Sequence, residues 1–426
     1  MKFFLFSLGC KVNSYELDTL RNALEKAGHK EVFSAVEADL IIVNTCSVTA
    51  TADQKSRQHI RKFRRLAPDA ILSVMGCYSE LHAQETLAMG ADIVLGTSKR
   101  SVLLKDVERF KSDHQKIVDV KKDVRHETYE EMGQMALADN ARAYLKVQDG
   151  CDNFCAYCLI PRIRGNSRSR EKEDTLREAK RLVENGYKEI VIAGIHIGAY
   201  GKEINDGTYR LGDLLRDMLT LCPELPRLRI SSIEESEIDE KMLSLLRDFP
   251  QVVDHLHIPL QSGSSSVLKR MKRRYDTARF LTKLEAIRAI RPDIAITTDV
   301  IVGFPEESDE EWKETMAFCE KARFAEIHVF PFSPREGTFA ATLPDTPAPI
   351  KEARVQELLA LSKRLRTEYE ERFYGKKLPI LFEDFDPKSG FAYGHSGNYL
   401  LVKIPSTKPL HGEIRDVVYS PSTQAD

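Results

Sequence analysis

Three cysteines with the spacing CxxxCxxC stand close together in this chain, directly after a stretch that is typical of a buried β-strand. The strand is expected over residues 143–147, and the cysteines are Cys151, Cys155 and Cys158. Three thiolates on one loop can bind three of the four irons of an iron–sulfur cluster, so the fourth iron stays open to another ligand. The motif therefore predicts a strand followed by a metal-binding loop.

A zinc site and a chance grouping of thiols are the alternatives to an iron–sulfur cluster. Structural zinc usually takes four protein ligands and favours CxxC pairs, whereas the next histidine after these cysteines is the distant His196. The spacing favours the cluster. An open iron can chelate the amino and carboxylate groups of S-adenosylmethionine and place its sulfonium for cleavage by one electron. We therefore expect this loop to bind that cofactor.

Three more cysteines share one setting, because each directly follows an apolar run that is typical of a buried strand. Helical stretches separate the runs, which predicts a parallel sheet with helices on both faces. Ligands gather at the carboxyl ends of such strands, so a second metal site is expected there, although cysteine is also a common small buried residue. Cys222 and Cys319 lack such a setting and are assigned to packing. The three cysteines are Cys10 after residues 3–9, Cys46 after 40–45 and Cys77 after 71–76.

The pattern of strands and helices divides the 426 residues into three domains of an α/β protein. Residues 1–111 are expected to form a parallel α/β domain, and the polar segment 112–140 a linker. Six strand and helix repeats over 141–374 predict a partial (β/α)6 barrel, with active-site residues at the carboxyl ends of its strands. Short alternating strands with glycine turns predict a small β-barrel over 375–426.

Several residues at the predicted strand ends of the barrel are candidate cofactor contacts. Glycines there allow the backbone to approach a ligand closely, and a carboxylate could hold ribose hydroxyls, although Glu234 could equally be a surface acid. Four histidines, His196, His255, His257 and His328, are expected to be satisfied core or rim residues. The candidate contacts are Tyr157, Gly194, Ser232, Glu234, Gln261 and Gly303.

Four arginines follow the CxxxCxxC loop and could guide nucleic-acid phosphates toward the predicted cluster. A run of charges is usually a solvated face. The formal net charge of −2 excludes a uniformly basic nucleic-acid binder, so any RNA contact must come from a local patch. These arginines are Arg162, Arg164, Arg168 and Arg170.

The sequence also predicts where the protein resides. No apolar stretch is long enough to span a bilayer, and charges at Lys11 and Glu16 come too early for a signal peptide. Grouped cysteines fit metal binding in a reducing compartment better than disulfides in a secreted protein. We therefore expect a cytoplasmic monomer that does not bind membranes.

The cysteine motifs belong to longer segments that resemble the radical S-adenosylmethionine methylthiotransferases over nearly the whole chain. The opening Gly-Cys-Lys-Val-Asn-Ser-Tyr-Glu of residues 9–16 is most similar to the branch that acts on N6-threonylcarbamoyladenosine in tRNA. The C-terminal segment resembles the RNA-binding TRAM module. The other matching segments are residues 44–49, 76–78, 260–264 and 299–305.

This resemblance implies a tRNA modification enzyme that methylthiolates C2 of N6-threonylcarbamoyladenosine next to the anticodon. It implies two 4Fe–4S clusters. The one on Cys151, Cys155 and Cys158 would cleave S-adenosylmethionine to the radical that takes the C2 hydrogen, and the one on Cys10, Cys46 and Cys77 would present the sulfur. Gly194 would lie where the methionine amino group is held. The expected partners are the tRNA anticodon stem-loop, its target base drawn out of the stack, and a small electron donor such as flavodoxin or ferredoxin.

Three other functions stay open at this point. Two are methylthiolation of N6-isopentenyladenosine in tRNA and of an aspartate of a ribosomal protein, which would need the same two clusters. The third is an electron-transfer or cluster-carrier protein, which would not cleave the cofactor and would not need the glycines Gly194 and Gly303 at strand ends.

Overall fold

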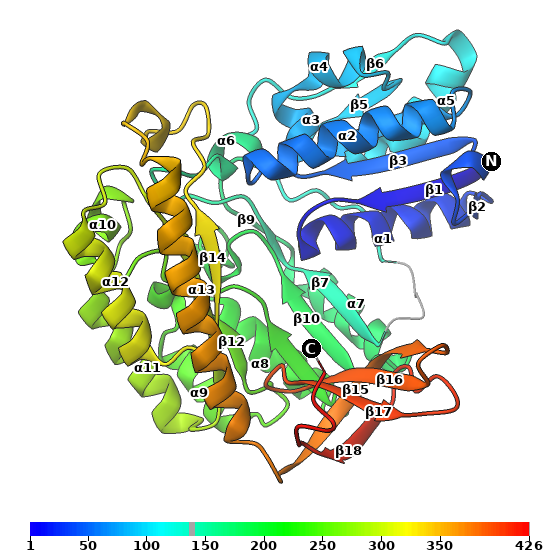
Figure 1. Ribbon diagram of the computed structural model, residues 1–426. Helices are drawn as coiled ribbons and strands as arrows, with labels where there is room; N and C mark the ends of the chain where they lie inside the picture. The colour runs from blue at the N-terminus through cyan, green and yellow to red at the C-terminus, as the bar shows by residue number, and fades with distance from the viewer. Residues whose placement is uncertain (136–140, 426) are drawn as a thin grey trace.

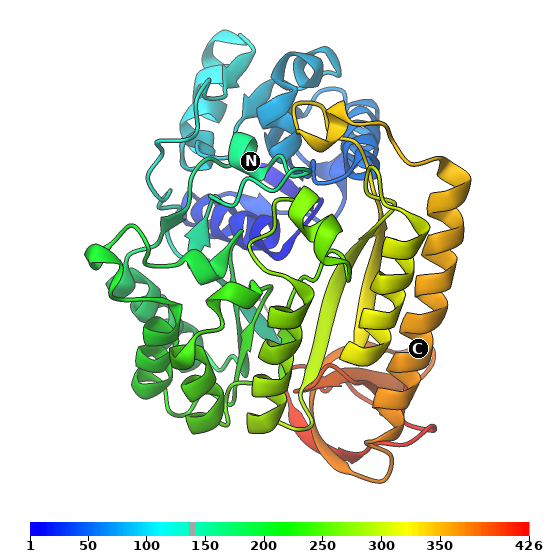
Figure 2. The same ribbon diagram turned by 90° about the vertical axis from the view of Figure 1, so that its left-hand side faces the viewer.

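The computed structural model describes residues 1–135 and 141–425. A first α/β domain and a small C-terminal sheet lie at opposite ends of a central partial barrel in both views (Figure 1, Figure 2). The mixed α/β fold class with parallel sheets is thereby confirmed. Residues 136–140 of the predicted linker lie outside the described residues.

The first domain is built on a six-stranded sheet in which every neighbouring pair is parallel. Strand β3 (Leu40–Thr45) is buried along its whole length because helices cover both faces of the sheet. In sheet order its neighbours are β2 (Lys30–Glu31) and β1 (Lys2–Ser7) on one side, and β4 (Ile71–Gly76), β5 (Ile93–Leu95) and β6 (Ile117–Asp119) on the other.

Two groups of helices cover the two faces of this sheet with apolar side chains. Leu20 and Leu103 belong to one buried cluster, and Ile60 and Tyr78 to the other. The first face carries α1 (Lys11–Lys26) and α5 (Leu103–Asp113), and the second carries α2 (Ala50–Leu66), α3 (Cys77–Leu81) and α4 (Ala83–Ala88). Strand β6 pairs with β5, so the sheet extends beyond residue 111 into the segment expected to be a linker.

The central part contains the six predicted strands, all parallel. They form two three-stranded sheets, and a parallel bridge between Ser232 and His257 joins them. The strands are β7 (Arg142–Lys146), β10 (Glu189–Ala193), β11 (Arg227–Ile230), β12 (His255–His257), β13 (Ala295–Val302) and β14 (Glu326–Pro331). A short antiparallel pair, β8 (Gln148–Asp149) and β9 (Arg168–Ser169), flanks the first strand.

Helices pack on the outer face of these strands and bury the largest apolar cluster of the described residues. The long helix α13 (Ala348–Glu371) crosses the side next to β14 (Figure 1). The other helices are α7 (Lys172–Glu184), α8 (Leu211–Leu221), α9 (Glu240–Asp248), α11 (Thr277–Ile290) and α12 (Asp309–Ala322), with shorter α6 (Ile160–Ile163) and α10 (Ser265–Arg270) in loops.

The C-terminal part is a curled antiparallel sheet in the order β17, β16, β15, β18. Its strands are β15 (Lys377–Asp386), β16 (Phe391–Ser396), β17 (Leu401–Pro405) and β18 (Ile414–Val418). Arg227 at the start of β11 donates hydrogen bonds to Pro379 O and His395 O, so this sheet covers the amino ends of the barrel strands. Among the described residues, no helix is both long and apolar enough to cross a membrane. The cytoplasmic location stays a prediction.

Candidate cluster and cofactor site

The CxxxCxxC loop lies between β8 and α6, at the carboxyl end of the first barrel strand. The Cys158 amide donates a hydrogen bond of 3.0 Å to Cys155 O, which curls the loop so that the thiols approach one another. His196 Nδ1 lies 3.6 Å from Cys151 Sγ. Burial raises the pKa of Cys151 to about 12 and that of Cys158 to about 11, so both are protonated thiols at neutral pH without a metal.

Arg273 supplies the positive charge at this loop. Its Nη1 lies 3.3 Å from Cys155 Sγ, and its Nη2 pairs with the Glu234 carboxylate. Three thiolates around a 4Fe–4S cluster carry net negative charge, which a buried guanidinium offsets. The residues present therefore fit such a cluster. Glu234 stands beside the loop as expected, although Arg273 already binds its carboxylate; the ribose role stays a prediction.

The second cysteine group comes together at the carboxyl edge of the first sheet. Cys10, Cys46 and Cys77 follow β1, β3 and β4, which are neighbours in that sheet. A Cβ placed on Gly9 would lie 2.9 Å from Cys46 Cβ, which shows how closely two of these loops approach. Burial, helped by the nearby thiols of Cys46 and Cys10, raises the pKa of Cys77 to about 12. Their binding of a second cluster stays a prediction.

Arg164 supplies positive charge beside this second group of cysteines, as Arg273 does beside the first. Asn13 Oδ1 accepts hydrogen bonds from Arg164 Nη2 at 3.2 Å and from the Cys10 thiol at 3.6 Å. The charge of Arg164 lowers the pKa of the Cys77 thiol, against the stronger effect of burial. A buried cation beside three thiols again fits an anionic cluster.

A fully buried ionic network joins the first domain to the barrel. Glu16 Oε1 on α1 lies 2.6 Å from Arg100 Nη1, 3.0 Å from Arg164 Nη1 and 3.2 Å from Lys146 Nζ. Asp149, two residues before the first cysteine of the loop, also pairs with Lys146 and Arg164. Burial raises the pKa of Glu16, but the three cations outweigh burial and lower it to about 2.

The prediction that the arginines after the loop bind RNA is wrong for three of them. Arg164 is fully buried, and Arg168 and Arg170 are 5% and 3% exposed. Their charges are used inside the protein, where Arg168 pairs with Asp149 and Arg170 with Glu178. Arg162 is exposed and stays a candidate for RNA contact.

One cavity of about 200 Å³ is lined by residues from the segments that adjoin both cysteine groups. Tyr157 from the CxxxCxxC loop forms one part of its wall, and Val48 and Thr49, which follow Cys46, form another. Residues of β13 and β14, together with residues that follow β12 and β14, complete the wall. They are Gln261, Asp299, Ile301, Phe330, Pro331, Phe332, Ser333 and Arg335.

Two of the predicted cofactor contacts line this cavity. Tyr157 packs edge-on against Phe304, with ring centroids 6.5 Å apart, so its ring is held at the wall. Gln261 has a φ of 69° and donates its amide to Asp299 O at 2.8 Å. Ser232 is exposed beside β12. Contact of these three residues with a cofactor stays a prediction.

The structure gives the two predicted glycines a packing role. A Cβ at Gly194 would lie 2.7 Å from Ile197 Cγ2 and 3.0 Å from Gln148 O. Gly303 has a φ of 69°, and a Cβ there would lie 2.4 Å from Lys351 Cγ. These contacts require glycine whether or not a ligand is bound.

Gly303→Ala should lower the free energy of unfolding by about 2–3 kcal/mol, because the left-handed backbone strain and the contact with Lys351 add. Gly375→Ala is the matched control, since Gly375 has a φ of 80° but no neighbouring atom within 4 Å of an added Cβ. Gly375→Ala should lower the free energy of unfolding by about 1 kcal/mol. Thermal unfolding followed by circular dichroism compares the two, and equal midpoints would contradict the packing explanation.

Sequence reasoning missed the residues that hold the two cysteine loops in place. Arg335 Nη2 donates to Asp53 Oδ2 at 2.7 Å and to Ser47 O at 3.0 Å, so it fastens the loop after Cys46 to the barrel. Arg273 lies in the basic run from Lys269 to Arg274, and a run of like charges is usually a solvated face. No local pattern marks either arginine, because their partners are distant in the sequence.

Two family models match this chain, one over the first domain and one over the central barrel. A family model described as "Radical SAM superfamily" matches residues 145–319, and one described as "Uncharacterized protein family UPF0004" matches residues 2–96. The threonylcarbamoyladenosine tRNA methylthiotransferase MtaB of Bacillus subtilis (strain 168) is 41% identical over 414 residues, which cover 96% of this chain and 91% of MtaB. The chain belongs to the radical S-adenosylmethionine methylthiotransferases.

This radical S-adenosylmethionine methylthiotransferase has further relatives. The tRNA-2-methylthio-N(6)-dimethylallyladenosine synthase of Bacillus subtilis (strain 168) is 32% identical over 422 residues, covering 97% of this chain and 82% of that protein. Among solved structures, the radical S-adenosylmethionine methyltransferase TsrM from Kitasatospora setae superposes with a TM-score of 0.60 at 16% identity, covering 80% of this chain and 77% of TsrM. That likeness confirms the fold. The family resemblance predicted from the motifs is confirmed, and the enzymes of this superfamily use a 4Fe–4S cluster and S-adenosylmethionine.

Proposed function

We propose that this enzyme methylthiolates C2 of N6-threonylcarbamoyladenosine next to the anticodon of tRNA, using two 4Fe–4S clusters. The observation that carries the proposal is the cavity bordered by residues of both cysteine loops, through Tyr157 on one side and Val48 and Thr49 on the other. A base in that cavity would lie against residues from the segments that carry both cysteine groups. The 41% identity to MtaB supports the choice of nucleoside.

The two cysteine groups would divide the chemistry. Cys151, Cys155 and Cys158 would hold the cluster that binds S-adenosylmethionine, and Cys10, Cys46 and Cys77 the auxiliary cluster. When bound, the clusters supply the electron that cleaves the cofactor and the sulfur that is transferred. A radical route suits the target because acid–base catalysis cannot remove the hydrogen of an unactivated aromatic C–H bond.

The chain's own residues would position these groups and keep water out. Arg273 and Arg164 hold positive charge beside the two sets of thiols. Arg335 fixes the loop after Cys46 against the barrel, through Ser47 O and a buried ion pair with Asp53 on α2. Tyr157 presents a ring at the cavity wall against which the adenine of the cofactor would pack.

RNA would reach the cavity at the carboxyl ends of the barrel strands, the end at which Arg162 is exposed. Since the net charge is −2, the affinity would depend on local cations and fall steeply with salt. A small electron donor such as flavodoxin or ferredoxin would supply electrons. The rival nucleoside is N6-isopentenyladenosine, which the 32% identical relatives support through their printed names.

The decisive experiment is anaerobic reconstitution with iron and sulfide, followed by incubation with reductant, S-adenosylmethionine and tRNA carrying N6-threonylcarbamoyladenosine. Mass spectrometry should detect both 5′-deoxyadenosine and the 2-methylthio nucleoside. The same assay with isopentenyladenosine tRNA serves as the matched control. If 5′-deoxyadenosine forms but neither tRNA yields a methylthio nucleoside, the substrate would instead be a protein. If neither product forms, the protein would instead be a cluster carrier.

A further inference from the structure

The lumen of the barrel differs in chemistry from its outer face. Apolar residues of the strands, such as Ile190 and Leu256, belong to the core under the helices. The residues that alternate with these along each strand point into the lumen, and most of them are charged or polar. They include Arg142, Glu189, Arg229, His255, Asp299 and His328.

The inner end of this lumen carries more positive than negative charge. Glu189 pairs with Arg229 at 2.7 Å and with Arg142 at 3.4 Å, and Arg227 lies 3.7 Å away. Burial lowers the pKa of His255 well below its usual range, and the charges of Arg229 and Lys11 lower it further. A group that enters the lumen from the cavity therefore meets a positive potential.

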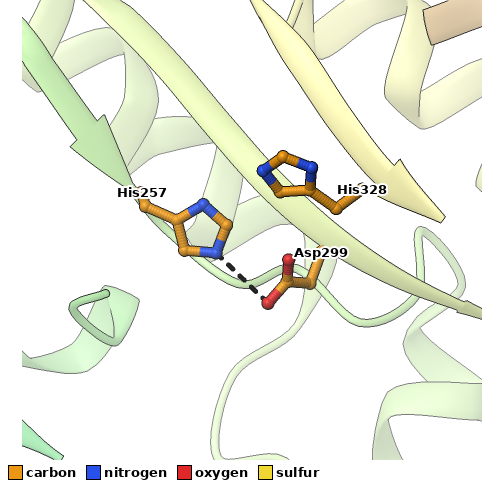
Figure 3. Close-up of side chains that lie close together, drawn as sticks. All are labelled: His257, Asp299 and His328. Carbon is orange, nitrogen blue, oxygen red and sulfur yellow. Dashed lines mark ion pairs between the residues drawn. The ribbon is translucent and has the colours of Figure 1, made fainter. Parts of the chain in front are cut away.

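Three side chains at the level of the cavity offer the contacts for such a group. His257 on β12 and Asp299 on β13 point toward each other, and His328 on β14 stands beside them (Figure 3). His257 Nε2 lies 3.1 Å from Asp299 Oδ2, and its Nδ1 lies 2.9 Å from Thr297 Oγ1. Both nitrogens of His257 are thus engaged, which fixes its ring.

His328 is the least engaged member of this cluster. Its side chain is 45% exposed, its ring centroid is 5.6 Å from that of His257, and its Nδ1 is 3.8 Å from Glu326 Oε1. Among the described residues its Nε2 has no hydrogen-bond partner. His328 can therefore donate to a ligand, while Asp299, which lines the cavity, can accept from a hydroxyl or amide.

We propose that the His257, Asp299 and His328 cluster is a subsite for the anionic N6 substituent of the target adenine, with His328 donating to its carboxylate. This inference rests on the proposed function. A base with C2 turned toward the cysteine loops directs its N6 group toward Asp299 and the positive lumen. Threonylcarbamoyl carries the carboxylate and hydroxyl that such a mixed site can pair, whereas an isopentenyl group carries neither.

The ligand atoms of the three residues also lie within 4.8 Å of one another, so a divalent cation is the competing occupant. Asp299 in the cluster and Glu326, 3.8 Å from His328, would attract such a cation, whereas Arg229 and Lys11 at the inner end of the lumen would repel it and attract an anion. Metal binding is therefore an outcome that would overturn the proposal.

The test measures Kd at fixed salt for anticodon stem-loop RNAs that differ only in the N6 group, with the cluster-loaded enzyme. One RNA carries threonylcarbamoyl, and the second carries its uncharged carboxamide. The wild-type enzyme should bind the carboxylate RNA about 10-fold to 100-fold more tightly, the range for a hydrogen bond to a charged group. His328→Leu should reduce this preference below about 2-fold, and His328→Gln, which keeps a donor, should retain part of it.

The control is His126→Leu, since His126 is exposed in the segment between the domains, and this variant should keep the full preference. An unchanged preference in His328→Leu would overturn the subsite, as would stoichiometric Zn²⁺ binding that this variant loses. A failure of the proposed function can be distinguished from a failure of the subsite. The first shows as the absence of methylthio product from the carboxylate RNA, whereas the Kd measurement requires no turnover.

Discussion

Cys10→Ser abolishes methylthiolation but leaves cleavage of S-adenosylmethionine intact; this is the result we expect if the two cysteine groups have separate tasks. Cys10 belongs to the group at the edge of the first sheet, and the three cysteines of the barrel loop are untouched. Cys10 is exposed and is the N-cap residue of α1, where its side chain makes no capping hydrogen bond. Serine is a favoured N-cap residue, so the variant should fold.

The measurement combines product analysis with iron content. Methylthio nucleoside should fall by at least about 100-fold, because one ligand of three is lost, while 5′-deoxyadenosine still forms. Iron should fall from about eight to about four per chain, which reports on the cluster without relying on activity. Cys222→Ala is the control, since Cys222 is buried in the barrel core far from either loop, and it should keep all the iron. Retained methylthio product in Cys10→Ser would contradict the division of tasks.

The strands that carry these cysteines could be predicted because their signal is local. Residues 40–45 and 71–76 are continuous apolar runs, which is typical of strands buried on both faces. Parallel neighbours then bring their carboxyl ends together, so the meeting of Cys46 and Cys77 follows from topology. Strand β6 was not predicted because it consists only of Ile117–Asp119. So short a stretch inside a polar segment shows no periodicity of apolar residues.

The arginines after the loop show what sequence alone could not reveal. A group of four cations within nine residues is typical of a solvated or phosphate-binding surface. The structure buries three of them because carboxylates come from elsewhere, and Arg164 meets Glu16 across 148 positions of the chain. The close packing of Gly303 could not be predicted either, because Lys351, the residue that an added Cβ would meet, is on the distant helix α13. Such pairings are set by tertiary packing rather than by local pattern.

Glu16→Gln should weaken the junction of the first domain and the barrel more than any surface change, because it leaves cations buried without their carboxylate. Glu16 is fully buried between Arg100, Arg164 and Lys146. Removing one partner of a buried ion pair typically costs about 3–5 kcal/mol. Urea unfolding at pH 7, followed by circular dichroism and Trp312 fluorescence, should show a midpoint lower by about 1 M or more.

The matched control is Glu368→Gln on α13. Glu368 is 40% exposed and pairs with Arg364 one turn away, at 2.8 Å. A solvent-exposed pair of this kind contributes about 0.3–0.5 kcal/mol, so its loss should hardly move the midpoint. Equal effects of the two substitutions would show that the buried network does not stabilise the junction.

The pH dependence of the difference between wild type and Glu16→Gln tests the electrostatic origin of this effect. Three cations lower the folded-state pKa of Glu16 to about 2, against 4.5 as its ordinary value. A depressed pKa gives stability that is complete above the ordinary pKa and is lost as the pH falls toward the folded-state pKa. The difference should therefore be full at pH 6 and shrink between about pH 4.5 and pH 2, by roughly 3 kcal/mol in all. A difference that stays constant down to pH 3 would instead assign the effect to packing, since glutamine and protonated glutamate are nearly the same size.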